Sequence, residues 1–398
     1  MQLQKKKNLT FACSAFFAGY YMLLYVISVM FSSYLIESGF DKGTVAAMSS
    51  ISAFILLFAK PLFSVIVDRG QCRTLAVCYA AAIALGCCIF FFSAERTMGH
   101  VLAYTLLCSV GNGVFMELTD AWVLKLIKQT GEVDYGRTRA FGSASFAVTG
   151  LLYGSAITAF GYGIAPWCIL TILAVLVSLA MYMPQPIPEE SSAKGGKGSL
   201  KDKLVLLRDP LFFVFLLCGS VAHSTLGTLD TFIPVLINEK GGSAFYTGLA
   251  SFVMAVIEFI MLRRFTRVAD KLGTYRVVMF GILGFGAKAL VVSLMPTPAL
   301  IIVACTLQVV SFCLYIPGRM RFLQQEVQQN NLAASLTLLS LASSLLSTFV
   351  TNPAAGYLSE NIGTAGMMRV IAAACFVAGT VFGLAVKRIT ARRAVSAK

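Results

Sequence analysis

The chain has 398 residues, of which 58% are hydrophobic and only 13% are charged. Soluble domains carry roughly 25% charged residues, so no water-soluble fold could bury this much apolar surface. The formal net charge of +14 raises the question of a nucleic-acid partner, which the distribution of the basic residues decides.

Apolar runs long enough to cross a membrane follow one another along the whole chain. A bilayer core of about 30 Å needs about 20 apolar residues per helix. Runs such as 51–58 and 169–181 are apolar on nearly all sides, whereas a transmembrane barrel would show alternating strands of about ten residues. We therefore expect an all-α membrane protein with twelve spans. The predicted spans are 11–36, 44–66, 74–94, 99–127, 136–160, 164–183, 210–237, 246–268, 275–295, 298–324, 332–358 and 364–388.

The basic residues are divided unequally between the connections. If the Lys5-Lys6-Lys7 end is cytoplasmic and the ends of spans are counted with the neighbouring connections, the odd-numbered connections hold four basic residues and the interiors of the spans hold Lys60 and Lys288. The even-numbered connections and the termini hold the other 26 of the 32. This bias follows the positive-inside rule and predicts both termini on the cytoplasmic side of the inner membrane. The charge thus reports topology, and we expect no nucleic-acid partner. The first span lacks a cleavage site of small residues and is expected to be retained.

Residues that could support an enzyme are sparse. Most of the eleven cysteines lie within or beside apolar spans and form no C-x-x-C pair, so we expect reduced, buried thiols without a metal. The two histidines, His100 and His223, form no cluster, and no Gly-x-Ser-x-Gly motif occurs. We expect neither an enzyme nor a bound cofactor.

One long polar stretch, 184–209, follows the sixth span. Its composition predicts a cytoplasmic linker between two domains, 1–183 and 210–398, each with six helices. The Gly195-Gly196-Lys197-Gly198 string lacks the first glycine of a phosphate-binding loop, so no ATP site is expected.

The loop after the second span of each half carries the same pattern of an acid, a base, a glycine and a further base, which indicates an internal repeat. The residues that we expect to act in conformational gating are Asp68, Arg69 and Arg73 in the first half, and Asp270, Lys271 and Arg276 in the second. Twelve spans, a central loop and these paired loops resemble the major facilitator superfamily.

The start of the fifth span, Tyr135-Gly136-Arg137-Thr138-Arg139, resembles the lactose-permease-like branch of that superfamily, which includes proton symporters for oligosaccharides, nucleosides and aromatic acids. The resemblance implies that Asp120, late in the fourth span, and Arg139 hold the substrate. Glu117 shares a helical face with Asp120 because it lies three residues earlier. These acids could also form structural ion pairs.

Ionisable residues inside the spans of the second half are candidates for coupling, since a charge at the bilayer centre costs at least about 2.5 kcal/mol. Glu258 is the first choice for a proton carrier, and Lys288 is its expected partner. His223, about 20 Å into its span, is a candidate for both substrate binding and proton coupling. Gln308 is assigned to substrate binding, and Asp230 to anchoring or gating near the external mouth.

Tyr20 and Tyr21 in the first span could stack on a sugar or an aromatic ring. Together these features predict a secondary transporter, expected to be monomeric, that takes up a small polar solute with protons by alternating access. A proton-coupled drug antiporter and a receptor or scaffold without transport remain alternatives on the same fold.

Overall fold

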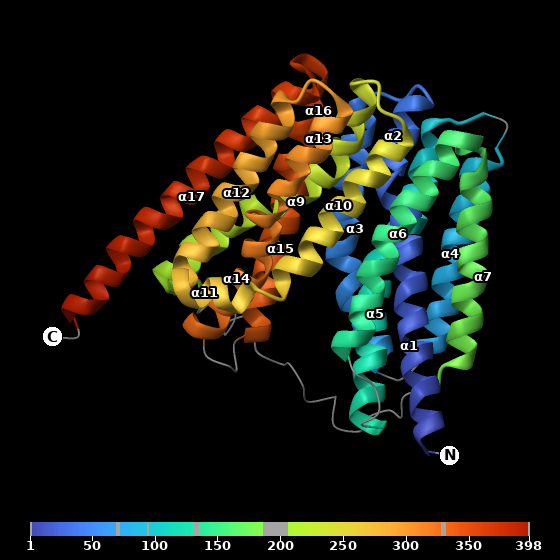
Figure 1. Ribbon diagram of the computed structural model, residues 1–398, viewed down its shortest axis with the longest axis horizontal. Helices are drawn as coiled ribbons and strands as arrows, with labels where there is room; N and C mark the ends of the chain where they lie inside the picture. Colours follow the sequence, from blue (N-terminus) through green and yellow to red (C-terminus); the bar gives the residue numbers. More distant parts are fainter. Residues whose placement is uncertain are drawn as a thin grey trace. The chain divides into compact units, whose positions relative to one another are not determined.

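The computed structural model describes residues 2–68, 72–93, 95–130, 135–185, 206–327 and 332–396, and most of them are helical (Figure 1). Each of the twelve predicted ranges overlaps a helix or a run of consecutive helices, which confirms the all-α fold. In the described part of the chain, ten helical segments are long and apolar enough to cross a membrane. The two remaining predicted ranges, 44–66 and 99–127, are covered by α3 and α5.

The first half of the chain forms six spans, the first of which contains a π-helical segment, η1, between α1 and α2. Their elements are α1 (Gln2–Leu24), η1 (Tyr25–Val29), α2 (Phe31–Glu37), α3 (Lys42–Asp68), α4 (Cys72–Phe91), α5 (Met98–Thr130), α6 (Tyr135–Phe160), η2 (Tyr162–Ile164) and α7 (Ala165–Tyr182).

The second half repeats this order, with interruptions in its fourth and fifth spans. Its elements are η4 (Leu206–Arg208), α9 (Pro210–Glu239), α10 (Ala244–Leu262), α11 (Phe265–Leu272), α12 (Thr274–Leu294), α13 (Pro298–Cys305), η5 (Thr306–Val309), α14 (Phe312–Glu326), α15 (Leu332–Leu346), η7 (Ser347–Thr351), α16 (Asn352–Asn361) and α17 (Gly363–Ser396). Asp209 caps α9 by accepting hydrogen bonds from the backbone of Leu211 and Phe212, and Pro210 suits the first helical position.

The chain divides into two compact units. Unit 1 comprises residues 1–39, 48–195 and 243–255, and unit 2 comprises residues 40–47, 196–242 and 256–398. The first turns of α3 therefore pack with the helices of unit 2, and the first half of α10 packs with those of unit 1. The domain boundaries expected from the linker stay a prediction, and most of that linker lies outside the described residues.

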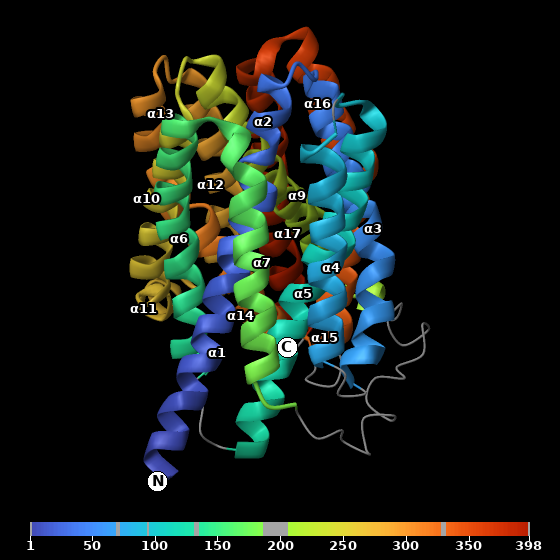
Figure 2. The ribbon, with the colours of Figure 1, turned by 90° about the vertical axis from the view of Figure 1, so that its right-hand side faces the viewer.

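In unit 1, α1 packs against α6 and α7, and α4 packs against α5 and α7. Helix α1 begins at the end of unit 1 where α7 ends (Figure 2). The start of α10 approaches α6 at backbone distance, because an added Cβ at Gly248 would lie 2.0 Å from the carbonyl oxygen of Gly150. Tyr25 strengthens this contact by a hydrogen bond of 3.4 Å to Ser251.

In unit 2, α12 packs against α9, α14 and α17, and α9 also packs against α15 and α17. Glycines again allow the closest approaches. An added Cβ at Gly284 would lie 2.1 Å from the carbonyl oxygen of Val310, and one at Gly281 would lie 2.8 Å from the backbone of Tyr315. The interrupted tenth span is therefore held directly against α12.

Candidate functional site

A chain of polar side chains crosses the interior of unit 2. Lys288 on α12 donates a hydrogen bond of 2.6 Å from Nζ to Oε1 of Gln308, and Gln308 donates one of 2.6 Å from Nε2 to Oε1 of Glu258 on α10. The side chains of Lys288 and Gln308 are buried, and Glu258 is half-buried. The side-chain amide of Gln308 thus accepts from the buried ammonium of Lys288 with its oxygen and donates to the carboxylate of Glu258 with its nitrogen.

The local backbone explains why Gln308 reaches both partners. Gln308 lies on η5, the 3₁₀ segment that separates α13 from α14. A 3₁₀ turn has three residues per turn where an α-helix has 3.6, so side chains along it are rotated from their α-helical directions. Lys288 lies one turn beyond Gly284, where α12 contacts Val310. The close approach of the two backbones brings the lysine to the amide.

Asp230 on α9 belongs to the same electrostatic group, because it interacts with both Lys288 and Glu258. Its side chain is exposed although it lies well inside a 30-residue helix. Lys288, Glu258 and Asp230 therefore form one cation with two acids. Such a group can hold or release a proton without leaving the lysine uncompensated.

His223, also on α9, contacts Arg319 on α14. Arg319 Nη1 lies 3.1 Å from His223 Nδ1. Of the residues that the sequence assigns to proton coupling, the structure thus joins Glu258 and Lys288 through Gln308. It places His223 beside an arginine that the sequence does not single out.

The substrate-binding residues predicted in unit 1 are located only in part. Glu117 and Asp120 lie on α5 and Arg139 on α6, but their side chains lie outside the described residues. Tyr20 and Tyr21 are buried on α1, with their rings packed edge to face 5.3 Å apart. Their role in substrate binding stays a prediction.

The predicted gating loops differ in what is described. Arg69 and the side chain of Asp68 lie outside the described residues. Arg73 on α4 donates to the carbonyl oxygens of Ala180 and Met183, at 3.2 and 2.9 Å, and so satisfies the end of α7. Asp270 on α11 forms an ion pair of 2.8 Å with Arg321 on α14, while Lys271 and Arg276 are exposed.

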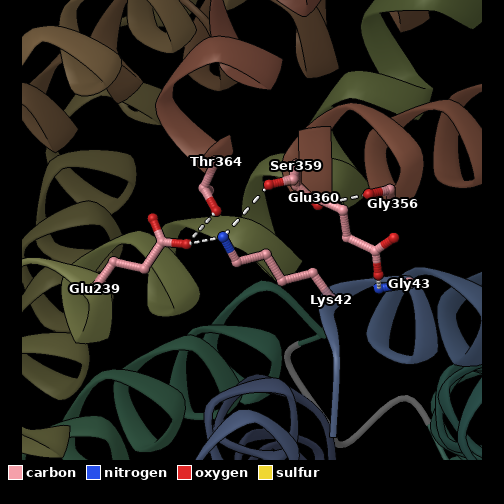
Figure 3. Close-up of polar contacts among 7 residues, drawn as sticks. All are labelled: Lys42, Gly43, Glu239, Gly356, Ser359, Glu360 and Thr364. Carbon is pink, nitrogen blue, oxygen red and sulfur yellow. Dashed lines mark hydrogen bonds and ion pairs between the residues drawn. The ribbon is translucent and has the colours of Figure 1, made fainter. Parts of the chain in front are cut away.

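A second polar cluster in unit 2 surrounds the start of α3 (Figure 3). Lys42 forms an ion pair with Glu239 at the end of α9, and its Nζ also donates a hydrogen bond of 3.4 Å to the carbonyl oxygen of Ser359 on α16. Thr364, at the start of α17, donates a bond of 2.7 Å to Glu239. Lys42, from the first sequence half, thus contacts α9 and α16 directly and is linked to α17 through Glu239.

The neighbouring residues extend this cluster along α16. The backbone N–H of Gly43 donates a hydrogen bond of 2.7 Å to Glu360. An added Cβ at Gly43 would lie 2.6 Å from the same carboxylate oxygen, which the flexible Glu360 side chain could move away. Gly356 is more constrained, since its Cβ would lie 2.6 Å from Cβ of Ala46. The start of α3 and α16 therefore meet through small residues.

Asp41 fixes where α3 begins. Its carboxylate accepts a hydrogen bond of 2.6 Å from the backbone N–H of Thr44, three residues on, as an N-cap residue does. Hydrogen bonds from the side chain and the backbone of Thr44 hold the pKa of Asp41 below its usual value. The cap therefore stays ionised at neutral pH and places Lys42 and Gly43 in the first turn.

Comparison with known proteins identifies the family of this chain. A model of the MFS_1 like family matches residues 12–370. The chain belongs to this family. The match confirms the membership in the major facilitator superfamily that the paired loops predict, and the chain is a membrane transporter of this type.

Related members of the family have transporter names. A maltose permease of Geobacillus stearothermophilus is 22% identical over 86% of each chain. A putative nucleoside transporter of Escherichia coli, YegT, is 25% identical over 52% of this chain and 50% of its own.

Among solved structures, the nucleoside transporter NupG matches with a TM-score of 0.78 at 16% identity, covering 96% of this chain and 99% of its own. A POT family transporter matches with a TM-score of 0.74 at 11% identity, covering 95% and 96%. At these identities the structural likeness concerns the fold alone.

Proposed function

We propose that this chain is a proton-coupled secondary transporter that takes up a small polar solute, such as a sugar, a nucleoside or an aromatic acid. The observation that carries the proposal is the Lys288–Gln308–Glu258 chain in the interior of unit 2. Charges inside membrane spans are costly and usually serve transport. The names of the relatives, a maltose permease and a putative nucleoside transporter, fit solutes of this size and polarity.

Protonation of Glu258 supplies the coupling in this proposal. The ionised carboxylate accepts the Gln308 N–H and is linked through the amide to the charge of Lys288. Adding a proton cancels the negative charge and weakens this bond, since hydrogen bonds to charged groups are roughly twice as strong as neutral ones. The contact between Gln308 on η5 and Glu258 on α10 is then weaker, and the equilibrium shifts toward the opposite orientation of the transporter.

Alternating access also needs contacts that hold one orientation closed. The cluster around Lys42 suits that role, because it joins the start of α3 to the ends of α9 and α16 by a few polar bonds (Figure 3). In the topology predicted from the basic residues, this cluster lies on the external side and both termini lie in the cytoplasm. It would then close the external side and open when the solute is exchanged.

The test compares accumulation with exchange in proteoliposomes under an imposed pH gradient. Glu258→Gln mimics the protonated acid, so we expect it to abolish proton-driven accumulation and to preserve equilibrium exchange, which needs no net proton movement. The exposed acid Glu95 provides the matched control, because Glu95→Gln should change neither rate. Accumulation by Glu258→Gln at the level of the unmodified protein would refute the assignment. Extrusion of a dye instead of accumulation of solute would favour the antiporter alternative.

A further inference from the structure

Two polar contacts, here called rungs, join α9 and α14 beside the stacked rings of Phe215 and Phe322. In the first rung, the hydroxyl of Tyr315 donates a hydrogen bond of 2.6 Å to the carbonyl oxygen of Gly219. In the second, Arg319 contacts His223 at 3.1 Å. Tyr315 and Arg319 are four residues apart and share one face of α14, and Gly219 and His223 share one face of α9 in the same way. Both contacts join these two faces.

Chemistry determines the roles in the second rung. A guanidinium has only N–H donors and stays protonated in proteins. Arg319 Nη1 is therefore the donor, and Nδ1 of His223 is the acceptor. The imidazole must be neutral in this arrangement, with its proton on Nε2. His223 thus holds the arginine in place but does not neutralise its charge.

No carboxylate in the described part of the chain pairs with Arg319. Arg321, two residues further along the same helix, shows the contrast, because it pairs with Asp270 at 2.8 Å. Two acids of unit 2, Asp230 and Glu258, interact with Lys288. Nor is Arg319 saturated with hydrogen bonds, since its Nε is buried without an acceptor among the described residues.

Arg319 is half-buried on a membrane-spanning segment. An arginine there that has no counter-charge among the described residues and keeps an unused buried donor is expensive to keep. An anionic ligand removes both costs. The Nε–H and the adjacent Nη–H of a guanidinium form a fork that matches the two oxygens of a carboxylate. A fixed guanidinium of this kind selects for a carboxylate over a hydroxyl.

We infer that Arg319 is the anchor for a carboxylate group of the transported solute, and that His223 and Tyr315 position it. The inference rests on the proposed transport function and narrows its substrate class to carboxylate-bearing sugars, nucleosides or aromatic compounds. Arg319 binds the solute directly. His223 acts through Arg319 by accepting the hydrogen bond from Nη1.

Matched solute pairs test this assignment without any transport measurement. Thermal unfolding of the purified full chain is followed in titrations with glucose and glucuronate, with uridine and uridine 5′-carboxylate, and with benzyl alcohol and benzoate, at constant pH and ionic strength. We expect the carboxylate member of at least one pair to bind about tenfold more tightly than its alcohol, a difference of about 1.4 kcal/mol.

Three variants separate the role of Arg319 from general effects of charge. Arg319→Gln should abolish the preference for the carboxylate. Arg321→Gln, on the same helix, should keep it. Arg319→Lys retains the charge but loses the fork, so it should bind the carboxylate several-fold more weakly than the unmodified protein. This variant decides the matter if Arg319→Gln does not fold.

Two results would overturn the inference: an unmodified protein that shows no carboxylate preference in any pair, or a preference that persists in Arg319→Gln. Proton-driven accumulation of a neutral solute alone would leave the proposed transport function intact while removing the role of Arg319 as a carboxylate anchor. Carboxylate binding without proton-driven accumulation would support the anchor and contradict the proposed coupling, so the two proposals fail separately.

Discussion

Replacing Lys288 by methionine removes the only cation of the Lys288–Gln308–Glu258 chain and leaves its hydrophobic stem in place. The lysine is 0% exposed and its Nζ lies 2.6 Å from Gln308. Removing one partner of a buried charge pair costs about 3–5 kcal/mol, because the remaining charge loses its compensation. We expect Lys288→Met to destabilise the protein by up to that amount, since Glu258, which is half-buried, and Asp230 then lose the charge of Lys288.

The double variant Lys288→Met/Glu258→Gln distinguishes lost charge compensation from lost packing. Exchanging both buried charges for neutral groups is often close to neutral for stability. We therefore expect the double variant to regain most of the loss, with a coupling energy of about 2–3 kcal/mol between the two positions. The exposed lysine Lys240 supplies the control, because Lys240→Met should stay within about 0.5 kcal/mol of the unmodified protein.

Unfolding by titration with SDS in mild detergent micelles measures these differences. A Lys288→Met variant no less stable than Lys240→Met would show that the buried ammonium does not compensate the acids. A double variant as unstable as the sum of the two single variants would show that the cost lies in packing rather than in charge. Either outcome would remove the electrostatic basis of the proposed coupling.

Two further predictions concern the Lys42 cluster and the orientation in the membrane. Lys42→Glu and Glu239→Lys should each favour the orientation in which this cluster is open, and the double charge swap should restore the original ratio, as measured by the accessibility of an introduced cysteine. The side chains of Lys42 and Glu239 are 25% and 28% exposed, so their ion pair contributes no more than about 1 kcal/mol. This corresponds to a change of about fivefold in the ratio of the two orientations. A double charge swap with the same ratio as the single variants would contradict this prediction. A cysteine at position 240 should react with an impermeant reagent from outside intact cells and one at position 197 should not, whereas labelling of position 197 from outside would reverse the topology.

The spans can be predicted from the sequence because hydropathy and length are local properties. Glu258 and Lys288 stand out for a similar reason, since a charge inside an apolar run is visible without knowing its neighbours. The bridging position of Gln308 is not predictable in this way. It depends on the 3₁₀ turn of η5 and on the contact of Gly284 with Val310, and neither is encoded by a local motif that we recognise.

Arg319 does not stand out in the sequence because it counts among the basic residues that the positive-inside pattern assigns to the cytoplasmic side. Its sequence neighbour Arg321 does form an ion pair with a loop acid, Asp270. Two residues along an α-helix correspond to a rotation of about 200°, so these two arginines face different surroundings. A helical wheel of α14 places Tyr315 and Arg319 on one face, and this is the sequence feature that could have indicated Arg319.

From the sequence, Lys42 is only a charge in an external connection, although Asp41 and Thr44 beside it form a helix start that sequence can predict. Its partner Glu239 is far away in the chain, at the end of α9. Pairing over such a separation depends on the tertiary fold. A single sequence gives no indication of which two end charges will meet.

The way that α3 and α10 begin in one unit and continue in the other has a mechanical consequence. Each helix passes from one unit to the other without a break, α3 after Ala47 and α10 after Ala255. A rotation of one unit against the other would therefore have to be accommodated within these two helices, near Ala47 in α3 and near Ala255 in α10. Glu258 lies three residues beyond Ala255, so the acid of the proposed coupling lies next to the point where α10 passes from one unit to the other.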